Sequence, residues 1–356
     1  MVSILPRLSG ALLIAGAAPL ASAQSSAVPE GAPALGPVGA AEGAAARSFA
    51  DDFEVGALVR AFWAYADDDL GGNAVNGFGF HDIDMWAELP IDQYDFRASF
   101  EADTGTARLE DAYIRYVKSE ALAAVVGSFK PRVLFSNSVD PELLMFNERT
   151  LLGTFFDNWD IGAQASGRVV EKLDYFVSIT NGADGSKDDK LYVLRGEWCF
   201  QGQGVMLQEG LHGISGEKDI DLGLVFFQDT GDDEVGLGVD VLARFEKFCV
   251  QFEAMSLDDG LSGNAGLKTV PVALSGDSMP WAISGSTMLS DTMQIAGRIQ
   301  SADNNAETRI LSVALDYYPA DGPICLIAQV DRYDEDGNNE GFVLQLGASM
   351  GRSRNR

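Results

Sequence analysis

Charged side chains stand at both ends of one long irregular stretch, residues 131–158. Lys130 and Arg132 flank its start, and the adjacent Glu148 and Arg149 lie near its end. Rings of Lys and Arg around a pore favour anions, so these four residues could filter charge. Charge-assisted hydrogen bonds also hold loops in place. The residue types therefore indicate either an anion filter or the tethers of a loop.

Seven arginines fall in short runs in which apolar and polar residues alternate. Successive side chains of a strand point to opposite faces, so the alternation assigns these arginines to the water-facing side. They could form a track for anions. The same faces also carry carboxylates, and mutual pairing of the charges is the alternative. The arginines are Arg60, Arg97, Arg115, Arg168, Arg195, Arg244 and Arg298, and the carboxylates are Asp95, Glu101, Asp111, Asp160, Glu197 and Asp240.

Alternating runs cover most of the chain after residue 52. In residues 235–246 the odd positions are all apolar, whereas Gly, Asp, Arg and Glu occupy most even positions. A tilted strand needs about 9–11 residues to cross a bilayer, and many of the runs approach this length. No later segment approaches the ~18 consecutive apolar residues of a spanning helix. The runs predict about sixteen strands, near residues 53–66, 78–89, 93–103, 109–118, 122–130, 158–170, 172–180, 190–200, 220–229, 234–246, 248–258, 280–289, 291–302, 307–318, 323–333 and 341–350.

Long and short connections alternate between these runs. If the N-terminus is periplasmic, the odd-numbered connections face outward, and outer-membrane barrels keep their inward turns short. Residues 90–92 and 290–291 are short inward connections, whereas 131–158 and 258–279 are long outward ones. A soluble β-sandwich explains the alternation within strands but not this parity. One inward connection, 201–219, is too long for the rule and indicates a missed strand or a fold-back.

Four short motifs follow one another between residues 109 and 167. They are DAY at 111–113, GSFKP at 127–131, FNER at 146–149 and DIGAQASG at 160–167. Their order resembles the phosphate-selective porin O and P family. The resemblance implies an all-β fold, a transmembrane antiparallel β-barrel of about 16 strands whose third extracellular loop folds into the pore.

The third outward connection, residues 131–158, is also rich in apolar residues. A loop of this composition is not expected to stand in water. By the resemblance it narrows the channel, which places Lys130, Arg132, Glu148 and Arg149 at or near the constriction. Because trimers are common among sixteen-stranded porins, a homotrimer is the assembly expected by analogy.

The two ends of the chain predict its targeting. Residues 1–23 have an Arg, an apolar run and the small residues of a signal-peptidase site, so we expect a signal peptide cleaved after Ala23. Residues 24–51 read as a flexible periplasmic leader, 52–350 as the barrel domain and 351–356 as a basic tail. These features predict the outer membrane of a Gram-negative-type bacterium, with lipid and the outer-membrane assembly machinery as partners. The tail is unusual, because such barrels usually end on an aromatic residue.

Composition excludes several classes of function. The formal net charge of -28 argues against a nucleic-acid partner. His81 and His212 are the only histidines, and no HExxH, GxSxG or CxxC motif occurs, so we expect no enzyme. The three cysteines lie far apart in the sequence, so no metal site and no cofactor are predicted.

The sequence therefore predicts an outer-membrane porin for the passive diffusion of small hydrophilic solutes, with anions such as phosphate as the narrower expectation. Its 53 acidic residues against 25 basic ones argue against phosphate specificity. A secreted soluble β-sandwich that binds a ligand is the alternative.

Overall fold

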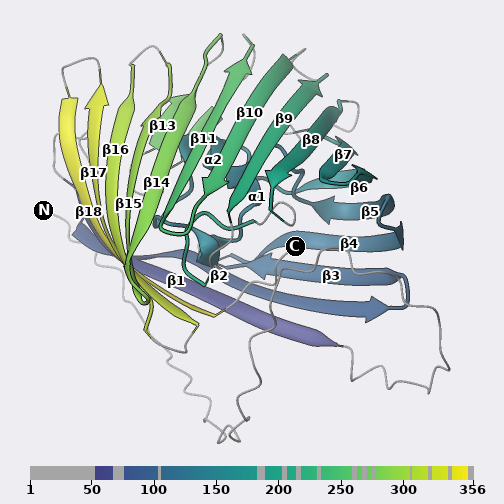
Figure 1. Cartoon of the computed structure of the whole chain (residues 1–356), viewed down its shortest axis with the longest axis horizontal. Coiled ribbons are helices and arrows are strands. Elements are labelled where there is room, and N and C mark those ends of the chain that lie inside the picture. Colours follow the sequence, from purple (N-terminus) through teal and green to yellow (C-terminus); the bar gives the residue numbers. More distant parts are fainter. Residues whose placement is uncertain are drawn as a thin grey trace, which may run out of the picture. The chain divides into compact units, whose positions relative to one another are not determined.

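Sixteen antiparallel strands close into a β-barrel in the computed structural model (Figure 1). The structure describes residues 53–66, 76–102, 106–182, 189–202, 207–213, 218–230, 234–258, 263–266, 271–274, 277–304, 307–319, 323–335 and 339–351. The predicted signal peptide 1–23, the leader 24–51 and all but the first residue of the tail 351–356 lie outside the described residues. Among the described residues, no helix is long and apolar enough to cross a membrane.

The barrel strands agree with the sixteen predicted runs. Each barrel strand pairs with the barrel strands before and after it in the chain, and β1 pairs with β18 to close the barrel. The bounds are β1 Glu54–Ala66, β2 Asn76–Ile91, β3 Tyr94–Glu101, β4 Arg108–Ser119, β5 Leu122–Phe129, β6 Asp160–Val170, β7 Leu173–Thr180, β8 Leu191–Gln201, β9 Asp219–Asp229, β10 Glu234–Arg244, β11 Phe248–Leu257, β14 Trp281–Ser290, β15 Met293–Ser301, β16 Arg309–Tyr317, β17 Ile324–Glu335 and β18 Asn339–Gly351.

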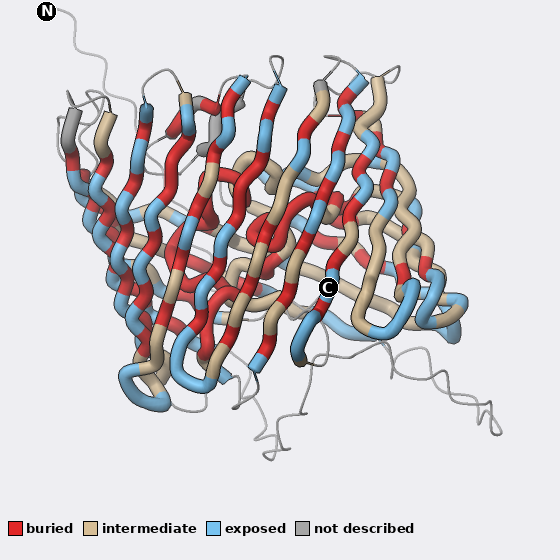
Figure 2. Tube along the Cα trace, turned by 45° about the horizontal axis from the view of Figure 1, so that its top comes forward, coloured by how far each residue is buried: buried red, intermediate tan, exposed pale blue. Residues whose placement is uncertain are grey.

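The strands carry apolar residues outside and polar residues inside. In β16, Leu311 and Val313 are 46% and 50% exposed, whereas Ser312 and Asp316 are fully buried. Buried and exposed residues alternate in this way along many strands (Figure 2). A soluble sandwich would bury its apolar face, so the exposed apolar belt disfavours that alternative and matches strands that face lipid.

The connections follow the predicted parity. At one end of the barrel, turns such as 92–93, 120–121 and 291–292 are short, and at the other end lie the long connections 130–159 and 258–280. The second of these holds a small hairpin, β12 Gly263–Gly266 with β13 Pro271–Leu274, where the sequence predicted only a loop.

The third outward loop, residues 130–159, folds inside the barrel. It contains α1 Phe135–Ser138, a 3-10 turn at Pro141–Leu143 and α2 Leu151–Phe155. Leu134, Leu151 and Leu152 are buried in an apolar cluster with inner-face residues of β8, β9, β11 and β16–β18 and with the β12–β13 hairpin. The lumen therefore has its own hydrophobic core, which holds the loop in place.

The long inward connection also enters the barrel. Leu211 packs with Phe135, Val139 and Leu144 of the third loop. The amide of Glu209 donates to the carbonyl of Leu143 over 3.1 Å. The sequence indicated either a missed strand or a fold-back in residues 201–219. In the described part, residues 207–213, the chain folds back into the barrel.

Candidate functional site

A polar cavity lies between the third loop and the wall formed by β2, β3 and β4. Its volume is about 40 Å³, enough for about three water molecules. Five carboxylates and four basic groups line it. The lining residues are Asp82, Asp84, Trp86, Arg97, Ser99, Glu101, Arg108, Glu110, Lys130, Pro141, Arg149, Asp157 and Trp159.

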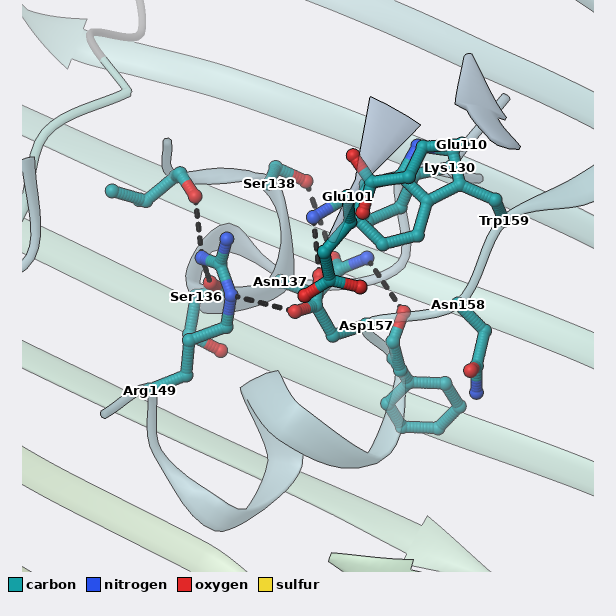
Figure 3. A network of polar contacts seen from close by, with 12 residues as sticks. Glu101, Glu110, Lys130, Ser136, Asn137, Ser138, Arg149, Asp157, Asn158 and Trp159 are labelled. Atoms are coloured by element: carbon teal, nitrogen blue, oxygen red, sulfur yellow. Dashed lines mark hydrogen bonds and ion pairs between the residues drawn. The ribbon is translucent and has the colours of Figure 1, made fainter. Parts of the chain in front are cut away.

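Lys130 and Asp157 close the base of the third loop. They form an ion pair across the two ends of the loop, and the Lys130 ammonium lies 4.4 Å from the centre of the Trp159 ring. Arg149 reaches the same carboxylate, with Nε 3.1 Å from Oδ2 (Figure 3). Burial raises the pKa of Asp157, but the charges of Arg149 and Lys130 outweigh burial and hold this pKa well below its ordinary value. Asp157 is therefore ionised in the folded protein.

Arg149 ties the loop to itself. Its Nη1 donates to the carbonyls of Ser136, over 2.9 Å, and Val139, just after α1. These carbonyls would otherwise lack partners at the end of a short helix. The neighbouring Glu148 is buried as well, and its backbone carbonyl accepts a hydrogen bond from Arg298 of the barrel wall. The pair Glu148 and Arg149 thus lies within the folded loop, close to the cavity.

Arginines of the wall hold the backbone of the loop. Arg60 Nη2 donates to the carbonyl of Asn147 over 2.7 Å, and Arg298 Nη1 donates to that of Glu148 over 3.0 Å. Arg195 Nη1 donates to the carbonyl of Val133 over 2.9 Å. Hydrogen bonds to charged donors are strong, and buried carbonyls need partners, so these side chains fix the position of the loop.

The predicted basic residues all lie on the inner face of the barrel or in the third loop, and each has an acidic or carbonyl partner. Arg97 pairs with Asp111 over 2.8 Å beside the cavity, and Arg132 pairs with Glu197 over 2.6 Å. Arg195 also pairs with Glu197 and Asp240, Arg244 pairs with Asp219, Arg115 with Asp95 and Arg168 with Asp174. The arrangement brings Arg97, Lys130 and Arg149 together at the cavity and leaves Arg132, Arg195 and Arg244 away from its lining.

The mixed charges make the cavity polar without a strong excess of either sign. Each basic residue in its lining is paired: Lys130 and Arg149 with Asp157, Arg97 with Asp111, and Arg108 with Glu101. Arg108 is the most solvent-exposed of the paired residues in the cavity lining, with 58% of its side chain accessible. Such a site can orient small hydrated solutes.

Sequence reasoning missed the contribution of residues 207–213. Met145 of the third loop donates its amide to Glu209 Oε2 over 3.0 Å, and the His212 ring stacks on Tyr318 at 3.7 Å between ring centres. Burial raises the pKa of Glu209 and lowers that of His212. The only sequence signal of this inserted segment was the unusual length of its connection.

The closed barrel is similar to solved structures of bacterial porins. OprB of Pseudomonas putida superposes with a TM-score of 0.62 and 8% identity over 85% of this chain and 95% of that chain. The anion-selective porin from Comamonas acidovorans superposes with a TM-score of 0.58 and 9% identity over 84% of this chain and 99% of that chain. A triple mutant of the Rhodopseudomonas blastica porin superposes with a TM-score of 0.54 and 12% identity over 84% of this chain and 100% of that chain. At these identities the similarity shows the fold.

A scan against protein-family models finds no match, and a search of the curated proteins finds none either. The resemblance of the four motifs to the phosphate-selective porin O and P family therefore stays a prediction.

Proposed function

We propose that the protein is an outer-membrane porin through which small hydrophilic solutes diffuse passively. The observation that carries this proposal is the third loop, which folds inside a closed barrel and leaves a polar cavity along β2–β4. The apolar outer belt supports a place in lipid. The porin fold of the structural neighbours supports the same class of function by analogy.

The narrow cavity supports a low conductance. Its small volume and the two segments that fill the lumen leave little room for large solutes. Pores exclude solutes by their diameter and by the charges along their walls. We therefore propose that ions and small hydrated molecules pass, and that larger solutes are excluded.

Passage of anions such as phosphate is the narrower form of this proposal, with Lys130, Arg97 and Arg149 as its path. The carboxylates that pair with these residues weaken the attraction for anions. We therefore expect weak ion selectivity rather than phosphate specificity. The predicted outer-membrane location and the homotrimer belong to the same proposal, and crosslinking of the detergent-purified protein tests the trimer.

Single-channel recording in a planar bilayer tests this function. The folded protein, identified by its heat-modifiable migration in gels, should give small stable conductance steps, whereas heat-denatured protein should give none. In a KCl gradient the reversal potential should lie close to zero. The absence of steps from folded protein would overturn the proposal.

A charge substitution at the cavity tests the role of its lining. Arg108→Ala should move the reversal potential toward cation selectivity, because Glu101 and Glu110 then lose a positive neighbour. Arg309→Ala is the matched control, since Arg309 is similarly exposed, with 66% of its side chain accessible, and is not in the cavity lining. Equal reversal potentials for both variants would place the ion path elsewhere.

A further inference from the structure

One sulfur and two carboxylates converge on the inner face of the barrel near its short-turn end. Cys199 lies close to the end of β8, and Asp219 and Asp221 lie at the start of β9. The strand register pairs Cys199 with Asp221. One ligand atom from each of the three residues lies within 4.8 Å of the others, and all three residues are buried.

The backbone at this point is shaped to bring the groups together. The pairing of β8 with β9 shifts between Cys199 and Gln201, which marks a bulge. Bulges re-aim side chains. Gly202 follows with φ of 116°, and a Cβ there would lie 2.2 Å from Asp219 Oδ1. A residue with a side chain would therefore displace the Asp219 carboxylate from its place beside Cys199.

The two carboxylates differ in their partners. Asp219 Oδ2 accepts from Arg244 Nη1 over 2.8 Å. Asp221 is only 4% exposed, and neither of its carboxylate oxygens accepts a hydrogen bond from an amide, hydroxyl or guanidinium group within the described part of the chain. Buried carboxylates normally pair with a cation or coordinate a metal. This side chain points into the cluster, where the Arg244 guanidinium hydrogen-bonds to Asp219 rather than to Asp221.

The charges of the cluster match a divalent cation. A thiolate and two carboxylates carry three negative charges, Arg244 supplies one positive charge, and a divalent cation supplies the remaining two. Zn²⁺ is bound by thiolate sulfur and carboxylate oxygen, usually in tetrahedral geometry. Zn–S bonds of about 2.3 Å and Zn–O bonds of about 2.0 Å place a sulfur and an oxygen ligand about 3.5 Å apart. The observed distance from Cys199 Sγ to Asp219 Oδ1 is 3.7 Å.

We propose that Cys199, Asp219 and Asp221 form a binding site for one Zn²⁺ ion. The carbonyl oxygen of Gln201, 3.2 Å from Cys199 Sγ, stands beside the three ligands, and it or a water molecule fills the fourth position. The site lies at the base of the connection between β8 and β9, whose residues 207–213 enter the lumen. The sequence predicted no metal site because its cysteines are far apart; the sheet register supplies the carboxylates instead.

Metal content of the folded protein tests the site. Detergent-purified wild-type protein is stripped with a chelator, dialysed against ZnCl₂ and analysed for zinc by mass spectrometry. Wild type should hold one zinc per chain, and Asp221→Asn and Cys199→Ser should each lose it. Cys325→Ser is the matched control and should keep it, because Cys325 is also a buried inner-face thiol but belongs to no such cluster among the described residues.

Cobalt gives an independent readout. Co²⁺ in place of zinc should produce thiolate-to-cobalt charge-transfer absorption in wild type and in Cys325→Ser, and none in Cys199→Ser. Heat-modifiable gel migration verifies that each variant is folded. A wild type that binds no zinc, or folded Cys199→Ser and Asp221→Asn variants that bind as much as wild type, would overturn the site. Neither experiment depends on conductance, so the site can fail while the proposed pore stands.

Discussion

The two sides of the barrel lumen differ in what lies against them. Along β8–β18, the inner residues are almost all buried beneath the third loop, the β12–β13 hairpin and residues 207–213. Along β2–β7, many inner residues remain half-exposed, and the polar cavity lies on this side. One alternating strand pattern thus builds both a packed core and a water-accessible wall. The side against which the inserted connections pack becomes the core, and the other side stays accessible to water.

The arginines of the two sides show the same difference. On the filled side, Arg195 and Arg298 donate to backbone carbonyls of the third loop. On the open side, Arg115 and Arg168 pair with carboxylates of neighbouring strands and keep 35% and 24% of their side chains accessible. Similar residues therefore anchor a loop where they are buried and line an aqueous wall where they are not.

The largest difference in stability is expected between Arg195→Met and Arg168→Met. Removing Arg195 leaves the buried Asp240 and Glu197 with fewer positive partners, and breaking a buried pair costs about 3–5 kcal/mol. Removing Arg168 breaks a half-exposed pair, which costs about 0–1 kcal/mol. The free energies of unfolding in detergent micelles measure both. Equal losses would mean that the two sides are packed alike.

A smaller loss of stability is expected from a substitution at Gly347, where the third loop packs against the inner face of β18. A Cβ at Gly347 would lie 1.9 Å from Asn147 Oδ1, so Gly347→Leu must displace the buried Asn147 side chain and, through it, press on the loop. Overpacking of this kind costs about 1–3 kcal/mol, and the displaced loop should change the single-channel conductance. Gly297→Leu is the control, because only one neighbouring atom lies within 4.0 Å of its added Cβ. If Gly347→Leu left stability and conductance unchanged, the loop would not rest on this wall.

The smallest effects are on the pH dependence of stability. Asp157 and Glu209, which both hold the third loop, should change the free energy of unfolding with opposite sign as the pH rises. The depressed pKa of Asp157 gives stability that is present above the unfolded pKa of about 4 and is lost as pH falls further. The raised pKa of Glu209 costs stability as pH rises above about 4. Asp157→Asn should therefore flatten the acid limb of the unfolding profile, and Glu209→Gln should raise stability at neutral pH. A Glu209→Gln variant less stable than wild type at pH 7 would contradict the second assignment.

The sequence predicted the barrel well because strand periodicity is a local signal. All sixteen barrel strands overlap predicted runs, and the parity of the connections correctly grouped the third loop with the other long connections at one end of the barrel. Apolar residues such as Leu134 and Phe146 predicted that this loop is not exposed, and both are fully buried. Period and composition are enough for these inferences.

The partners of the charged residues could not be predicted, because they depend on contacts between distant segments. The contact between Arg60 and the carbonyl of Asn147 spans 87 residues, and that between Arg298 and Glu148 spans 150. The position of Glu209 against the third loop has no periodic signal at all. The approach of Asp221 to Cys199 follows from strand register and a bulge, which alternation alone does not fix.

Cysteine labelling tests most directly the claim that solutes pass along β2–β4. Asp84→Cys places a thiol in the cavity lining, and Ser312→Cys places one on the fully buried inner face of β16. A charged methanethiosulfonate reagent, with wild type as the background for the native cysteines, should sharply lower the single-channel conductance of Asp84→Cys and leave Ser312→Cys unchanged. Block of Ser312→Cys, or full conductance of labelled Asp84→Cys, would contradict the account.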